Sequence, residues 1–352
     1  MSNRKLLPAI LIILSTNFSY SQNIELSKKP GLENFTSKVS PINKQFAATV
    51  DFVDAAISSI SSFISLIKKE NYRTKIISFN NPTSSDIGFS LENEIQTALK
   101  PMLAKAKNTN INKFSSVVSS LLSTQNKTIG VKSALNLVNP VFPTLLSIVG
   151  TLTIQEKKIT REDLDSFILI TSKYFVQYEK LNQSNILFDH NIDKLNTKLK
   201  DLQFDVKEYM LDIIIVINPQ IQRSTIKNLS TEELLLKYLD KYKLSFIVEP
   251  QSSLATRVYP SDGIKGAKEI SSNLQKLFAE YQLVYTENYQ QIKSILTDSK
   301  TLGKSINQKQ VDVSLKELEE LYTESKASDV MSLRLNTITE RLKMLVATEQ
   351  LL

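Results

Sequence analysis

Residues 160–213 carry the pattern that decides the fold, and they read TREDLDSFILITSKYFVQYEKLNQSNILFDHNIDKLNTKLKDLQFDVKEYMLDI. Fifteen positions recur in this stretch at alternating spacings of three and four residues, and 13 of them are apolar: Leu164, Phe167, Thr171, Tyr174, Tyr178, Leu181, Asn185, Phe188, Ile192, Leu195, Leu199, Leu202, Val206, Tyr209 and Ile213. These fifteen positions, called the seam below, have heptad spacing and form one stripe of the helix that faces partner helices. Thr160 is the expected N-cap, with Glu162 and Asp163 in the first turn, where the helix dipole favours acids.

The length of this helix sets the architecture that we expect. Fifty residues at 1.5 Å each give about 75 Å, which exceeds the diameter of a compact domain of this size. The sequence therefore predicts an all-α fold, an elongated bundle of long antiparallel helices with coiled-coil-like packing. Asn185 is a polar residue on the seam, where it either fixes the helix register or forms an ordinary hydrogen-bonded break in the core.

Similar spacings divide the rest of the chain into parts. The first part of the bundle covers 44–217, with further helices predicted from Phe46 to the polar stretch around Asn80–Pro82, over 85–107 and over 111–121. The second part covers 267–352, with helices from Ile270 to Leu296 and through Met331–Leu345. Residues 22–43 are predicted to be an extended lead-in. Residues 218–266 are predicted to be a small α/β insertion, because a capping box at Ser230–Glu233 precedes a strand-like stretch at Leu244–Glu249.

The composition excludes several classes of site. The chain has 352 residues with 7 Gly, 10 Pro, no Cys, no Trp and one His. Scarce Gly and Pro disfavour sandwiches, barrels and Gly-rich phosphate loops, and the absence of Cys excludes disulfides, thiolate metal sites and thiol nucleophiles. The sequence has no GxSxG, P-loop, GxGxxG or HExxH motif. We therefore expect no catalytic residue, no cofactor, no metal and no small-molecule substrate.

Two weak candidates for chemistry have simpler structural interpretations. His190 is the only histidine, and its place relative to the seam predicts a solvent-exposed side chain. Asp51 and Asp54 lie one turn apart and have the spacing of an acid–base pair, but they fit the polar face of an amphipathic helix. The seam aromatics are predicted to be core residues: Tyr174, Tyr178, Phe188 and Tyr209.

The N-terminus predicts export. Arg4 and Lys5 precede an apolar stretch, Leu6–Leu14, and Ser19–Ser21 follow, which is the order of a secretory signal peptide over residues 1–21. Nine apolar residues are too few to span a bilayer. The segment resembles signal peptides of the Bacteroidetes. We expect cleavage after Ser21 and a periplasmic or secreted protein.

Positive charge is concentrated in one window. The formal net charge is +7, and the 61 residues between Glu94 and Glu156 contain six Lys but no Asp or Glu. The window ends in 23 uncharged residues, 133–155, within which a short apolar helix is predicted over 140–153. This helix is either a buried core helix or a membrane element that basic residues attract to anionic lipid. The flanking lysines that would face lipid are Lys127, Lys132, Lys157 and Lys158.

The layout resembles the α-helical pore-forming toxins of the cytolysin A and haemolysin BL class, in which an apolar segment lies between long helices. The resemblance implies that the apolar segment is masked in the soluble form and inserts into a membrane on assembly. The residues that would make this membrane or partner contact are Val141, Phe142, Leu145, Leu146, Ile148, Val149 and Leu152.

The sequence thus leaves two functions open. The first is an exported, non-enzymatic helical-bundle protein that acts through contacts with a protein, with the cell envelope or with itself. The alternative is a membrane-active, pore-forming toxin-like protein that inserts residues 133–155, with an anionic membrane as its partner. Nucleic acid is not expected as a partner, because no run of five or more basic residues occurs.

Overall fold

The computed structural model describes residues 41–105, 138–155, 159–243, 262–326 and 329–349, together with Ser116 and Ser120. The chain divides into two units, residues 1–39 and 40–352, and the described residues belong to the second. The predicted signal peptide, the helix predicted over 111–121 and the strand predicted at Leu244–Glu249 lie outside the described residues, apart from the two serines.

Every regular element in the described part of the chain is helical, which confirms the all-α class. The elements are α1 (Pro41–Ile67), α2 (Asn71–Ser78), α3 (Leu91–Leu103), α5 (Val138–Gln155), α6 (Arg161–Ile217), α7 (Arg223–Ile226), α8 (Thr231–Leu234), the π-helical segment η3 (Leu235–Leu239), α10 (Asp262–Ser299), α11 (Gln308–Lys326) and α12 (Asp329–Glu349). Helix α1 begins at Pro41 and α10 at Asp262, so each helix starts a few residues before the boundary that the sequence predicted.

Helix α6 is the predicted long helix, and its 57 residues extend for about 85 Å. It begins where the sequence predicts, because Asp163 N donates to Thr160 Oγ1 at 3.3 Å and Thr160 N donates to Asp163 Oδ2 at 2.9 Å. This reciprocal pair satisfies backbone donors that the first turn leaves without partners. Fourteen of the fifteen seam positions are buried, and Leu164 is half-buried. The seam therefore lies in the core.

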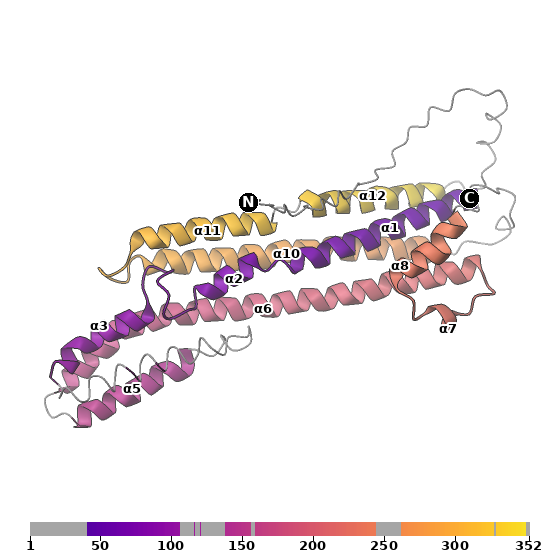
Figure 1. Ribbon diagram of the computed structural model, residues 1–352. Helices are drawn as coiled ribbons and strands as arrows, with labels where there is room; N and C mark the ends of the chain where they lie inside the picture. Colours follow the sequence, from indigo (N-terminus) through magenta and orange to yellow (C-terminus); the bar gives the residue numbers. More distant parts are fainter. Residues whose placement is uncertain are drawn as a thin grey trace, which may run out of the picture. The chain divides into compact units, whose positions relative to one another are not determined.

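The long helices lie side by side, and α6 is contacted by α1, α3, α5 and α10 (Figure 1). Helix α10 contacts α6 and is antiparallel to it, since Lys180 pairs with Asp298 near one end and Lys198 with Glu280 further along. Helix α1 contacts α6, α10 and α12, while α3 and α5 contact α6 near its start. One side of the α6–α10 pair is thus packed by α1.

A cluster of aromatic rings joins these helices in the core. The Tyr72 ring on α2 lies 5.6 Å from Phe188 on α6 and 5.2 Å from Tyr285 on α10 between centroids. Tyr72 Oη donates to Asn288 Oδ1 at 2.8 Å, and Asn288 Nδ2 donates to the Ser184 carbonyl at 3.2 Å. The buried hydroxyl therefore has a partner, as burial of a polar group requires.

Candidate functional site

Helix α5 is the apolar helix that the sequence singled out, and it extends slightly beyond the predicted 140–153 at both ends. Leu145 and Val149 are fully buried, and Leu146 and Ile148 pack against the core as half-buried side chains. Ser147, between them, is exposed. Since α5 contacts α6, the described side chains make one face of α5 a core face.

The remaining predicted contact residues are only partly described. Val141, Phe142 and Leu152 lie on α5, and their side chains are outside the described part of the chain. The predicted lipid-facing lysines also lie outside it: Lys127, Lys132, Lys157 and Lys158. Within the basic window, Lys105 is paired, because its Nζ lies 2.6 Å from Asp163 Oδ2 at the start of α6. This contact and the Thr160 amide lower the pKa of the Asp163 carboxyl.

One stretch of the described chain is long and apolar enough to cross a membrane, and it is Asn43–Ser78, which covers most of α1 and all of α2. Half of the most apolar segment within this stretch is buried. Buried core helices of soluble proteins share these properties, so the stretch fits the core position of α1.

An unexpected apolar surface lies on the first half of α6. Twelve large hydrophobic side chains are exposed among the described residues, and five of them lie between positions 169 and 187: Leu169, Ile170, Val176, Ile186 and Leu187. This stretch is less than a tenth of the described chain. A second series with alternating spacings of four and three passes through it, and we call that series the outer stripe: Glu162, Ser166, Leu169, Lys173, Val176, Lys180, Gln183, Leu187, His190 and Lys194.

The core side of the same half-helix is unusually polar. Its buried polar residues are Thr171, Gln177, Asn182, Ser184 and Asn185. Asn185 Nδ2 donates to the Ile76 carbonyl at 3.1 Å, while its Oδ1 is buried without a hydrogen bond. The seam asparagine therefore joins α6 to α2. From Phe188 to Ile217 the buried positions of α6 are all hydrophobic, so polar and apolar residues are distributed differently in the two halves.

Two hollows lie between α6 and α10, and the first of them lies beside the outer stripe. One has a volume of about 450 Å³ and is lined by Lys180, Gln183, Ser184, Leu187, Gln291, Ser294, Ile295 and Asp298. Ser184 Oγ donates to Gln291 Oε1 at 2.9 Å across it. Leu187 and Ile295 supply its apolar side chains, so this hollow has the character of a packing site with a polar rim.

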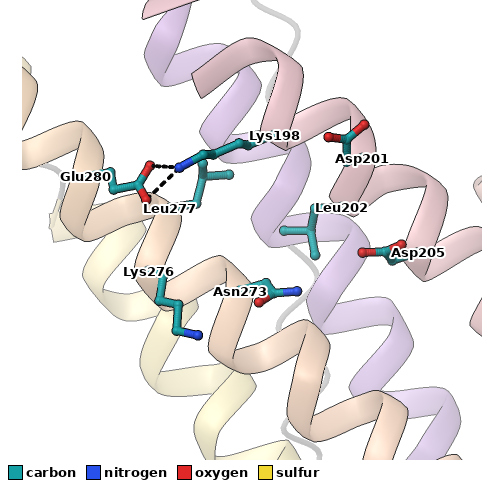
Figure 2. Close-up of a pocket in the computed structure, with 8 residues that line it drawn as sticks. All are labelled: Lys198, Asp201, Leu202, Asp205, Asn273, Lys276, Leu277 and Glu280. Atoms are coloured by element: carbon teal, nitrogen blue, oxygen red, sulfur yellow. Dashed lines mark hydrogen bonds and ion pairs between the residues drawn. The ribbon is translucent and has the colours of Figure 1, made fainter. Parts of the chain in front are cut away.

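The second hollow, of about 260 Å³, has Leu202 and Leu277 among its lining residues (Figure 2). Lys198 Nζ bridges both carboxylate oxygens of Glu280, at 2.7 and 2.6 Å. Burial, together with the neighbouring carboxylates Asp201 and Glu269, raises the pKa of Asp205. Charged side chains therefore surround the two leucines in this hollow.

The weak candidates for catalysis have structural roles or lie in solvent. Asp51 pairs with Lys243 and lies 3.6 Å from Arg341 Nη1, so it joins α1 to α12. Asp54 is exposed, and so is His190, as its position predicts. In the part of the chain that the structure describes, no three His, Cys, Asp or Glu side chains are grouped as a metal site.

The outer stripe was not among the predicted sites. Its signal was present in the sequence as the second heptad series, but charged and polar residues separate its apolar members. Comparison with protein-family models, curated proteins and solved structures finds no match to this chain.

Proposed function

We propose that this chain is an exported, non-enzymatic helical-bundle protein that acts through contact with another protein, with the cell envelope or with a second copy. We also propose that its bundle is elongated, with coiled-coil-like packing between the long helices and with a small α/β insertion that begins at 218 and ends before α10 starts at Asp262. The observation that carries the functional proposal is the concentration of exposed apolar side chains on the first half of α6.

Apolar surface exposed to water is unfavourable by about 25 cal/mol per Å², and a concentration of exposed apolar side chains favours an interaction surface. Single exposed hydrophobic residues are ordinary. Five of them within 19 residues of one helix, beside a hollow containing Leu187 and Ile295, favour a surface that a partner covers.

Binding to isolated envelope tests this function. The mature chain, from Gln22 onward, is mixed with envelope fractions before and after protease treatment, and sedimented protein is measured. We expect the Leu187→Glu variant to bind at least tenfold more weakly than wild type. Leu333→Glu, at an exposed leucine on α12, is the matched control and keeps wild-type binding. Equal binding by all three chains, or no binding by wild type, would contradict a contact function for this surface at the envelope.

The alternative function is membrane activity, and one specific observation favours it. Helix α5 is rich in apolar residues, and its described core face packs on α6 through Leu145 and Val149. A helix held on the outside of a bundle needs fewer contacts broken to leave it than a central helix does. Attraction of the basic window to anionic lipid would then bring α5 to the bilayer.

Dye release from liposomes tests the alternative. Release from anionic vesicles at low salt, with much less from neutral vesicles, is the result expected of a membrane-active protein. Absence of both release and lipid binding at low salt would refute it. Leu146→Asp then separates the two roles of α5, with Ser147→Asp on its exposed side as the control. Loss of folding identifies a core helix, and retained folding with lost vesicle binding identifies an insertion helix.

A further inference from the structure

We propose that the outer stripe of α6 binds a second copy of the chain, with the two α6 helices antiparallel. The inference rests on the proposed contact function, because it names the partner of the same surface. It follows from which side chains of the stripe face each other when two copies lie antiparallel.

The four–three spacing of the outer stripe allows two antiparallel copies to meet in register about position 178, and the side chains that then face each other match or complement one another. Leu169 and Leu187 are equally distant from position 178, and so are Glu162 and Lys194. Ile170 and Ile186, which flank the stripe, obey the same relation. A two-fold contact is isologous, so residue i meets residue j and residue j meets residue i. An antiparallel pair centred at 178 therefore places each leucine opposite the other leucine of the second copy.

Charge complementarity favours this direction over the parallel one. In the antiparallel pair, Glu162 faces Lys194 of the second copy at both ends of the contact. In a parallel pair in register, Glu162 faces Glu162 and Lys194 faces Lys194, and facing like charges are unfavourable. Both side chains are exposed in the single chain and are therefore accessible to a partner.

The lysines in the middle of the stripe do not prevent the contact. Lys173 donates to the Leu302 carbonyl, and Lys180 Nζ lies 3.8 Å from Asp298, so both ammonium groups lie against the chain beyond α6. Their aliphatic stems are then free to pack against a neighbour. Val176 of one copy faces the stem of Lys180 of the other.

The hollow beside the stripe gives the contact an anchoring site. Leu187 and Ile295 contribute to the lining of this space of about 450 Å³, and Leu187 is itself a stripe residue. The register places Leu169 of the second copy opposite Leu187, at this hollow. Leu169 is 75% exposed in the single chain. Burial of such a side chain in a partner's hollow is typical of a residue that dominates an interface.

Sedimentation equilibrium of the mature full chain tests the association. We expect a reversible dimer at micromolar concentration, and a dissociation constant raised at least tenfold by Leu169→Glu and by Leu187→Glu. Leu333→Glu is the control and leaves the constant within twofold of wild type. Circular dichroism checks that each variant is folded. A wild-type monomer at 200 µM, or equal weakening by the control, would overturn the proposal.

Cross-linking tests the direction, and the chain suits it because it contains no cysteine. Ser166 and His190 are exposed and occupy symmetric positions. We expect a mixture of Ser166→Cys and His190→Cys chains to form a mixed disulfide, while each variant alone forms little. Efficient homodisulfides with no mixed product would overturn the antiparallel arrangement.

Charge reversal gives an independent check. Lys194→Glu is expected to weaken the dimer, and addition of Glu162→Lys in the same chain is expected to restore it. No restoration would contradict the pairing. Envelope binding by a chain that stays monomeric would refute self-association and leave the proposed function standing, so the two failures are distinguishable.

Discussion

The turn between α2 and α3 supports a sharp prediction about stability, because Gly88 is packed where a side chain does not fit. Its φ is +87°, a value that residues with a Cβ rarely adopt. A Cβ there would lie 2.4 Å from Val311 Cγ2 and 3.1 Å from Ile306 Cγ2. The Gly88 carbonyl accepts from Asn307 N at 2.8 Å, and this bond ties the turn to the start of α11.

Two costs add in Gly88→Ala. The unfavourable backbone conformation costs about 1–3 kcal/mol. Movement of Val311 to relieve the overlap costs about 1–3 kcal/mol more. The restricted unfolded chain returns about 0.5 kcal/mol. We therefore expect the free energy of unfolding, measured by urea denaturation, to fall by about 1.5–5.5 kcal/mol.

Two further variants separate these contributions. In a Val311→Ala background the nearest clash is gone, so Gly88→Ala should cost about 0.5–2.5 kcal/mol, which is the conformational cost less the return from the unfolded chain. Gly150→Ala is the matched control, because Gly150 is in helix α5 and nothing lies within 4 Å of its added Cβ. It should gain up to about 1 kcal/mol from helix propensity. A loss below about 1 kcal/mol for Gly88→Ala would refute this packing of the turn.

Three further predictions concern α6 and α5. Asn185→Ala should lower the unfolding free energy by about 1–3 kcal/mol in urea denaturation, since the buried Ile76 carbonyl loses its donor; an unchanged value would contradict that bond. Burial raises the pKa of the Asp189 carboxyl, Asp193 raises it further, and Arg73 opposes the increase. Just above pH 3.8 the folded state therefore keeps a proton that the unfolded state has released. Stability from this group is lost as pH rises through the raised pKa, and Asp189→Asn should remove that part of the pH slope in thermal denaturation. Leu145→Ala should cost about 2–5 kcal/mol in the same denaturation because Leu145 is fully buried, and a cost under 1 kcal/mol would show that α5 is not packed on α6.

The sequence predicted the elements whose signals are local. The seam, the Thr160 cap and the Ser230 capping box depend on residues three or four positions apart, and all three are present. The buried seam aromatics follow from the same spacing. Such patterns are readable because helix geometry repeats every 3.6 residues whatever the rest of the chain does.

Features that depend on distant residues were not predicted. Ser299 Oγ donates to the Ile87 carbonyl and Ser314 Oγ to the Asp86 carbonyl, across 212 and 228 residues of sequence. Helix α11 was not predicted either, although it packs against the turn between α2 and α3. No local spacing predicts which serine donates to which carbonyl, because the packing of α10 and α11 determines these pairs.

The two halves of α6 differ in a way that connects its core to its outer surface. From Phe188 onward, hydrophobic burial stabilises the helix from the inside. Before Phe188, buried amides and hydroxyls replace part of that apolar surface, and the Asn185 Oδ1 has no hydrogen bond. Such groups contribute less to stability, and without partners they destabilise the core. The first half of α6 therefore gains less stability from the seam, and we propose that a second copy along the outer stripe adds to it.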